Sequence, residues 1–271
     1  MHQNELTYLF LKLNIWLSFT STLMVIATAM ALSIPLNEIG IALALPALLF
    51  YFIYTEDRRN VSPEDRINEP YRTQLVEKYQ TALLATEIAA LTAYEGIVVF
   101  LIYTTPAIGP VYLLLAQLPL AVLVAYDQLK QYPTFDSLAV GSTWSFVIMF
   151  STVIATATPI TPQFFIVTGT WLLIVIAGVE SRNVRDIDGD NETEKTTLAG
   201  YLGKRRTEFM NVTLKTISLG VFLVTTGVLT TLVVLLYLIF LQVFRELTAR
   251  ANTLTAPKDT PEQDPLTSSP R

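Results

Sequence analysis

Long apolar runs dominate this sequence, and they limit the folds that the chain can adopt. An α-helix needs about 20 apolar residues to cross the roughly 30 Å hydrocarbon core of a bilayer. Because 52% of the 271 residues are hydrophobic and 15% are charged, the chain has too little polar surface for a soluble domain. We therefore predict an all-α integral membrane protein. Apolar runs of spanning length lie at 8–33, 36–55, 78–103, 106–126, 137–157 and 162–180.

A seventh apolar run, 211–243, is too long for one span. It would form about 50 Å of helix at 1.5 Å per residue, which is more than one tilted span needs. It is either one overlong helix or a hairpin that turns near Gly227, so the bundle is predicted to have about seven or eight spans within a single domain at 1–245. The following segment, 246–271, is rich in Thr, Pro, Ser and charged residues, and a disordered tail is predicted there.

Positive charge is restricted to alternate loops. Lys and Arg occur in the loops after the second, fourth and sixth apolar runs, whereas the loops near 34–37, 104–110 and 158–162 contain none. Since Lys and Arg near span ends are retained in the cytoplasm, we predict a multi-pass protein of the cell membrane. Its two acidic segments, 55–72 and 180–206, should then face the cytoplasm.

Several kinds of chemistry are excluded by composition. The chain has no Cys and one His, His2, which rules out disulfides, thiol nucleophiles, His-ligated zinc and His general bases. Any catalysis must use carboxylates, Lys, Arg, Tyr, Asn and a bound metal. The formal net charge of -5 is mild, and no nucleic-acid partner is predicted.

The first acidic segment contains a predicted helix boundary. Ser62 and Pro63 fit the N-cap and first position of a new helix. Asp57 would then end one helix, while Glu64 and Asp65 would lie in the first turn of the next, where the helix N-terminus also favours phosphate. Such a corner can bind one metal ion from two sides. The alternative is a solvated membrane interface with ordinary helix capping.

The second acidic segment has oxygen ligands at helical spacing. Asn183, Asp186 and Asp190 are three and four residues apart, which places them on one helical face, with Glu180 one turn earlier. Such ligands suit Mg²⁺, which takes the rest of its shell from water and substrate phosphates. The run Asp-Ile-Asp-Gly-Asp is also similar to a calcium loop, but its glycine comes two positions early for an EF-hand, so that interpretation is rejected.

Together these motifs resemble those of the UbiA family of intramembrane prenyltransferases, over about residues 8–210. The family has an NDxxDxxxD motif after its second span and another Asp-rich motif after its sixth. NVRDIDGD at 183–190, KTTL at 195–198 and LGKRR at 202–206 match the second motif. INEPYR at 67–72 is nearly the sequence that follows the first motif in the chlorophyll synthase branch. AYDQLKQYP, which contains Tyr126 and Lys130, is similar to the YSxxLKR that follows the fourth span.

The first motif departs from the family pattern. Aligned backwards from Asn68, Asp65 takes the last Asp of the motif, Val61 the middle one, Arg58 the first, and Asp57 the Asn. Two of four oxygen ligands remain, and Glu64 is a candidate substitute. The resemblance therefore implies either a divergent enzyme or a non-catalytic member of the fold that binds a prenyl lipid or serves as a partner subunit.

For an enzyme, the resemblance implies Mg²⁺-dependent transfer of a polyprenyl group from an allylic diphosphate to a hydrophobic acceptor within the bilayer. The acceptor would be a quinone precursor, a lipid or a pigment, and diphosphate would leave. The implied metal ligands are Asp57, Glu64, Asp65, Asn183, Asp186 and Asp190. The implied diphosphate-binding residues are Asn14, Asn68, Arg72, Lys130 and Arg185. The implied catalytic residues are Tyr126, Lys130, Asp186 and Asp190.

Some of these residues have structural alternatives. Arg72 can simply mark a positive loop, Tyr126 can be an interfacial aromatic, and Asn14 can hydrogen-bond a neighbouring helix. Glu87 and Glu95, two turns apart in the third run, must each find a partner, be protonated or face a cavity. For Glu87 we predict a protonated, hydrogen-bonded structural acid, with activation of an acceptor as the alternative.

Two other membrane classes fit less well. A CDP-alcohol phosphotransferase requires a DGxxAR motif, which the sequence lacks. A transporter is expected to have repeated halves and polar residues near mid-membrane, whereas the charge here is concentrated at one face.

Overall fold

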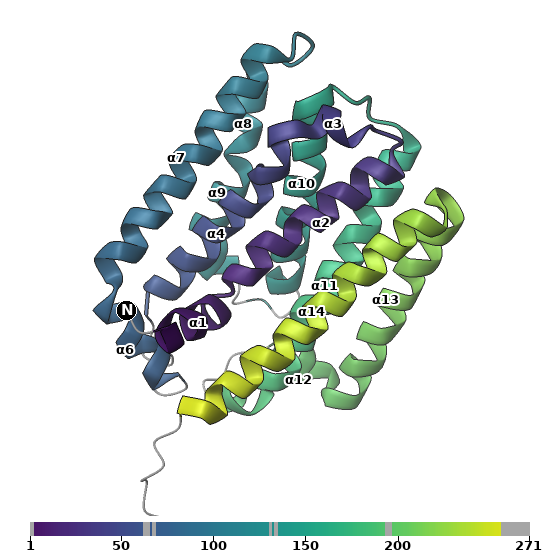
Figure 1. Ribbon diagram of the computed structural model, residues 1–271. Helices are drawn as coiled ribbons and strands as arrows, with labels where there is room; N and C mark the ends of the chain where they lie inside the picture. The colour runs from purple at the N-terminus through teal and green to yellow at the C-terminus, as the bar shows by residue number, and fades with distance from the viewer. Residues whose placement is uncertain are drawn as a thin grey trace, which may run out of the picture.

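The computed structural model describes residues 3–61, 66, 69–129, 132, 135–192 and 197–255, and these residues form helices joined by short connections (Figure 1). In chain order the helices are α1 Gln3–Lys12, α2 Ile15–Ala31, α3 Leu36–Ile39, the 3₁₀ helix η1 Gly40–Leu43, α4 Ala44–Arg59, α6 Pro70–Lys78, α7 Gln80–Thr104, α8 Val111–Ala116, α9 Leu118–Leu129, α10 Phe135–Thr156, α11 Pro162–Glu192, α12 Leu198–Leu202, α13 Lys204–Thr226 and α14 Val228–Thr255.

The described helices form a multi-pass membrane bundle. Six are long and apolar enough to cross a membrane, and the bent pair α1–α2 makes a seventh when counted as one span. The region Val111–Tyr126 is apolar but shorter. The all-α membrane class predicted from the sequence is therefore confirmed. The total of seven is reached because the last apolar run forms two spans, while the fourth run, at Val111–Tyr126, is too short to count as one.

We predicted one continuous span for the first apolar run, but the run is divided into two helices. It bends by 54° between α1 and α2. Asn14 lies at the bend with φ of 56°, in the left-handed region that Asn tolerates better than most residues. The predicted pocket residue Asn14 is thus half-buried at a helix break.

The fourth apolar run is also interrupted, at Gln117 between α8 and α9. Two residues of α7 satisfy polar groups there. Tyr94 donates its hydroxyl to the Ala116 carbonyl at 3.0 Å, and Glu95 accepts from the Gln117 side-chain amide at 3.0 Å. A break in an apolar region needs such partners, because lipid cannot hydrogen-bond exposed polar groups. The hydrogen-bond partner of Glu95 is therefore a neutral side-chain amide, that of Gln117.

The last apolar run turns at Gly227, as the hairpin alternative proposed. Gly227 has φ of 88°, a conformation that glycine adopts without steric cost. α13 and α14 meet there and pack together. α14 continues as a helix to Thr255, beyond the predicted boundary at 245. The rest of the predicted tail, 256–271, lies outside the described residues.

Aromatic residues join the helices in the core. Trp171 of α11 is fully buried and donates to the Thr28 hydroxyl of α2 at 2.8 Å. Its ring makes edge contacts with Phe222 of α13 and Tyr237 of α14. Four helices therefore meet around one indole, and this packing fixes α11 within the bundle.

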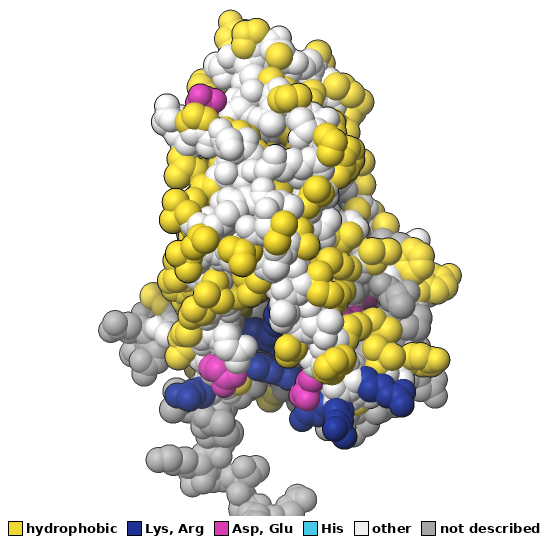
Figure 2. Space-filling model, turned by 90° about the vertical axis from the view of Figure 1, so that its right-hand side faces the viewer, with side chains coloured by type: hydrophobic (Ala, Val, Ile, Leu, Met, Phe, Trp, Pro, Cys, Tyr) yellow, Lys and Arg dark blue, Asp and Glu magenta, His cyan; other side chains and the backbone are white. Residues whose placement is uncertain are grey.

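Charged residues gather at one end of the bundle. Figure 1 shows α1, α6 and α12 at the lower end, opposite α3 and the α7–α8 turn. Figure 2 shows Lys and Arg at the lower end of one face, below a surface covered mainly by hydrophobic side chains. We refer to this lower end as the charged end. It contains the end of α4 and the end of α11, which carry the two acidic segments.

Candidate active site at the charged end

α4 ends within the first acidic segment, where an ion pair connects it to α7. Nε of Arg59 donates to the two carboxylate oxygens of Glu87 at 3.2 and 2.9 Å. Arg59 also donates to Glu56, which accepts in addition from Asn60 at 2.9 Å. Glu87 is fully buried, so it depends on this cation. Glu87 is therefore a hydrogen-bonded structural acid, as predicted. Its protonation remains a prediction, and activation of an acceptor remains the alternative.

Asp57 is the other carboxylate at this helix end. Its Oδ2 is 3.7 Å from Nε of Arg58, and its side chain is 44% exposed. The Arg59 ion pair does not involve Asp57. The carboxylate oxygens of Asp57 therefore remain accessible, as a metal ligand requires. The predicted helix start at Ser62 and the candidate ligands Glu64 and Asp65 lie outside the described residues.

Three cations converge beside this helix end. Lys12 of α1, Arg58 of α4 and Arg72 of α6 are all buried, and both arginines lie within Coulombic range of Lys12. Nζ of Lys12 is 2.8 Å from Oε1 of Glu69. Such a cluster attracts anions. The sequence indicated Arg72 only, because Lys12 and Arg58 are far from it along the chain.

The end of α11 is held by hydrogen bonds to its neighbours. Glu180 is fully buried and accepts from the Ser137 hydroxyl of α10. The next residue, Ser181, accepts from the Asn211 amide of α13 at 2.9 Å. Glu180 therefore contributes to the packing of α10 on α11. Asn183, which is also buried, lies beside Glu180.

Two tyrosines lie between the ends of α4 and α11. Tyr126 of α9 donates its hydroxyl to Asp136 of α10, and Tyr54 of α4 accepts from the Trp144 indole at 3.0 Å. Asp57 and Arg182 both lie within Coulombic range of each of these hydroxyls. The structure thus brings the two acidic segments to one site. The sequence motifs did not indicate Arg182 or Asp136.

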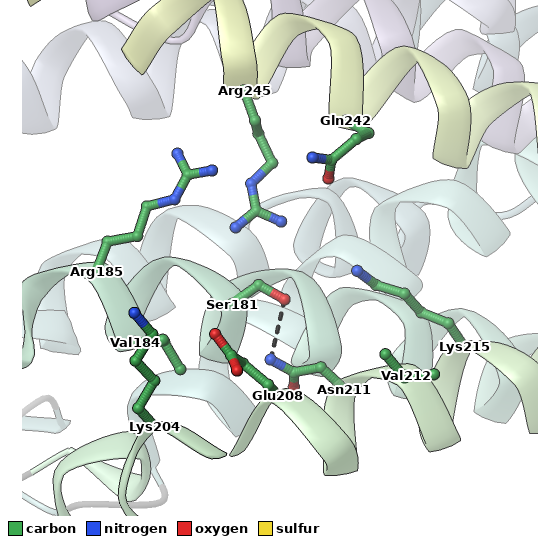
Figure 3. A pocket seen from close by; sticks show the side chains of 10 residues that line it. All are labelled: Ser181, Val184, Arg185, Lys204, Glu208, Asn211, Val212, Lys215, Gln242 and Arg245. Carbon is green, nitrogen blue, oxygen red and sulfur yellow. Dashed lines mark hydrogen bonds between the residues drawn. The ribbon is translucent and has the colours of Figure 1, made fainter. Parts of the chain in front are cut away.

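Arg185 lies toward α13 and α14. Its guanidinium is 3.7 Å from Glu246 of α14, and it lines a pocket formed with α13 and α14 (Figure 3). It is therefore not grouped with Tyr54 and Tyr126 in the described structure. The helix itself is as predicted, because α11 continues to Glu192 and places Asn183, Asp186 and Asp190 on one helix. The side chains of Asp186 and Asp190, and all of Asn68 and Lys130, lie outside the described part.

The donors at this site have the right chemistry for Mg²⁺ but are incomplete. Among the residues that the structure describes, no group of three Asp, Glu, His or Cys side chains could hold a metal. Asp57 and Asn183 supply oxygen atoms, which this hard cation prefers. The side-chain amide of Asn183 is buried and interacts with the Glu180 carboxylate. Because an amide binds a carboxylate through its N–H group, the amide oxygen is the atom left for a metal.

Comparison with known proteins identifies the family. Residues 62–259, most of the chain, match the model of the UbiA prenyltransferase family. Searches of the curated proteins and of the solved structures each give no match. The family match begins after Asp57 and extends past residue 210, where the sequence resemblance ended, into α14. The chain belongs to the UbiA prenyltransferase family.

Proposed function

We propose that this protein transfers a polyprenyl group from an allylic diphosphate to a lipid-soluble acceptor. The acceptor would be a quinone precursor, a lipid or a pigment. The observation that carries the proposal is the convergence of Asp57 and Arg182, from the two acidic segments, on Tyr54 and Tyr126 in a member of this family. We place the protein in the cell membrane with its charged end in the cytoplasm, on the basis of the Lys and Arg distribution.

Mg²⁺ would be held from both sides of the site. The proposed ligands are Asp57, Glu64, Asp65, Asn183, Asp186 and Asp190. When bound, the metal would neutralise negative charge on the leaving diphosphate.

Cations of the protein would contribute to the same task. Lys12, Arg58 and Arg72 form the buried cluster beside Asp57, and preorganised cations stabilise charge that develops on a leaving group. Arg58 occupies the position of the first motif Asp, so a cation replaces one carboxylate that the family uses. Asn14, Asn68 and Lys130 remain proposed diphosphate contacts. On α11, Arg185 remains a proposed contact, and Arg182 is added as a candidate because it lies within Coulombic range of Tyr54 and Tyr126.

Tyr126 has a restricted role in this proposal. Its hydroxyl proton is donated to Asp136, so it is not free for the diphosphate unless that bond breaks. We propose that the aromatic ring, rather than the hydroxyl, stabilises the allylic cation, since a cation is attracted to the face of an aromatic ring. Replacing Tyr126 by Phe should therefore reduce transfer much less than replacing it by Leu.

The activity can be tested with purified protein in detergent micelles. Geranylgeranyl diphosphate or a related donor is supplied with Mg²⁺ and candidate acceptors, and released diphosphate is measured. We expect Asp186→Ala and Asp190→Ala each to lower release by about 100-fold or more. Glu95→Gln is the control, since Glu95 contacts Gln117 away from the charged end.

The same assay separates the enzyme from a non-catalytic family member. A protein that binds the donor in a Mg²⁺-dependent way without releasing diphosphate from any donor would be a prenyl-lipid binder or partner subunit. The departure of the first motif, with Arg58 in place of an Asp, favours this second candidate. Absence of both release and Mg²⁺-dependent donor binding would exclude the enzyme.

A further inference from the structure

A second charged pocket lies between α11, α13 and α14. It has a volume of about 460 Å³ and is lined by residues of α11, α13 and α14 (Figure 3). Arg185 and Arg245 point into it from opposite walls, and Ser181 and Asn211 hydrogen-bond to each other at its centre. The volume is in the range of small-ligand sites. Tyr126 and Asp136 lie on α9 and α10, which do not line this pocket.

The pocket has an excess of positive charge. Its lining includes four cations, Arg185, Lys204, Lys215 and Arg245, and one carboxylate, Glu208. Among the described residues, Lys204, Lys215 and Arg245 form no ion pair, and Arg185 contacts Glu246 only at 3.7 Å. Lys215 lies within Coulombic range of Arg245, and Arg245 lies within Coulombic range of Arg185 and Arg182 as well as of one carboxylate, Glu246. These like charges repel one another, so a bound anion would stabilise the pocket.

Two of these cations belong to membrane-spanning helices, and their depth in the membrane limits the kinds of anion that can reach them. Lys215 lies about 16 Å along α13 from Lys204 at 1.5 Å per residue, and Lys215 and Arg245 both belong to candidate membrane spans. A charge at such a depth is costly unless it is paired or its side chain reaches the interface. A free ion from the cytoplasm would have to leave water to reach these cations. A phospholipid already lies in the bilayer, with its phosphate at the interface and its acyl chains in the hydrocarbon.

The surface around the pocket suits acyl chains. Val212 lines the pocket and is 65% exposed, and Val224 further along α13 is 86% exposed. Figure 2 shows Lys and Arg in a hollow near the lower end of this face, with hydrophobic side chains above it. A ligand with a phosphate at one end and hydrocarbon at the other matches both the cations of the pocket and the apolar surface beside it.

We propose that this pocket binds the phosphate of an anionic membrane phospholipid, with its acyl chains along α13 and α14. The phosphate would contact Arg185, Lys215 and Arg245, while Lys204 lies at the exposed rim. Since these cations come from three helices, the lipid would link α11 to α13 and α14. It would thereby fix the helix that carries Asn183.

Lipid retention by the purified protein tests this proposal without any reference to prenyl transfer. The protein is equilibrated with mixed micelles of phosphatidylglycerol and phosphatidylcholine, and bound lipids are measured by native mass spectrometry. We expect the wild type to retain phosphatidylglycerol in preference. The double variant Lys215→Gln/Arg245→Gln should retain it about tenfold less, because each basic residue contributes to binding of anionic lipid.

A matched control uses two cations of the same helix that do not line the pocket. Arg205→Gln/Arg206→Gln removes the same number of positive charges, both of them from α13, and should change retention by about twofold or less. Equal losses in the two double variants would show diffuse charge attraction and overturn the proposal. Equal retention of the two lipids by the wild type would also overturn it.

A competition arm distinguishes a lipid from a free anion. Retained phosphatidylglycerol should persist when inorganic phosphate is added in excess, and its displacement would assign the pocket to a free phosphate and overturn the proposal. If the double variant fails to fold, Lys204→Gln serves instead, because Lys204 is exposed. It should then lower phosphatidylglycerol retention by about threefold, and unchanged retention would contradict the proposal.

Discussion

The ends of α4 and α11 carry the two acidic segments, but they are held in place by different interactions. α4 is fixed to α7 by a charge pair, Arg59 with Glu87, inside the bundle. α11 is fixed to α10 and α13 by hydroxyl and amide groups, Ser137 with Glu180 and Asn211 with Ser181. A buried ion pair is costly to break from one side, since the remaining charge loses its partner. The position of α4 should therefore be more sensitive to single substitutions than that of α11.

The largest effect is expected at Glu87. Glu87→Gln leaves the Arg59 guanidinium with one carboxylate partner fewer in a buried setting, and we expect a loss of about 3–5 kcal/mol in the free energy of unfolding. Denaturation in mixed micelles, followed by circular dichroism, measures this change. The double variant Arg59→Met/Glu87→Leu should recover much of the loss, because neither charge remains. If Glu87→Gln lowers the free energy of unfolding no more than Glu95→Gln does, the ion pair does not hold α4.

Close packing of α10 on α11 gives the next prediction. A Cβ at Gly141 would lie 2.9 Å from Cδ1 of Leu172 and 3.0 Å from Cγ1 of Ile176. Gly141→Ala should therefore destabilise the protein by about 1–3 kcal/mol through overpacking. Gly169→Ala is the matched control within α11, since a Cβ there meets nothing within 4 Å. The control should be neutral or stabilising by up to about 1 kcal/mol. Equal effects of the two substitutions would argue against a close contact.

The hydrogen bond at Glu180 gives a comparable or smaller effect. Ser137→Ala removes the hydroxyl donor to Glu180 Oε1, so this buried carboxylate loses one of its hydrogen-bond partners. We expect a loss of about 1–3 kcal/mol, measured by the same unfolding assay. In a Glu180→Leu background the Ser137→Ala change should be nearly neutral, because no carboxylate remains to be satisfied. An undiminished cost in that background would contradict this assignment.

The smallest effect is expected at Asn211. Asn211→Ala removes the hydrogen bond to Ser181, and interhelical bonds of this kind average about 0.6 kcal/mol in membrane proteins, with a maximum near 1.7. A double-mutant cycle with Ser181→Ala isolates the pairwise energy. A coupling as large as that of Arg59 with Glu87 would remove the proposed difference between the two helix ends.

Much of the fold could be predicted from local sequence pattern, because membrane spans are defined by the length of apolar runs. The turn at Gly227 was one of two alternatives, and the positive φ of that glycine accounts for the outcome. The bend at Asn14 was not predicted. One polar residue in an apolar run is compatible with a pocket contact, a hydrogen bond or a helix break, and tertiary packing selects among them.

The candidate site was less predictable than the fold. The motifs indicated α4 and α11, but the partner of Glu87 depends on how α4 and α7 align with each other, which no local pattern encodes. The same holds for Lys12, which joins the site through Glu69. Arg185 belongs to a well-matched motif and was predicted to bind diphosphate, yet it faces α14, because its place around α11 is set by the packing of α13 and α14.

The bend at Asn14 also affects the order in which the protein can assemble. It directs α1 against α6 and α14, where Phe10 and the nearby Trp16 contact Phe244. Residues 3–12 leave the ribosome long before residues 228–255, with a delay on the order of ten seconds or more at about 5–20 residues per second. During that interval α1 lacks one of its packing surfaces. The charged end is therefore completed late in synthesis, when α14 has inserted and α1 can close against it.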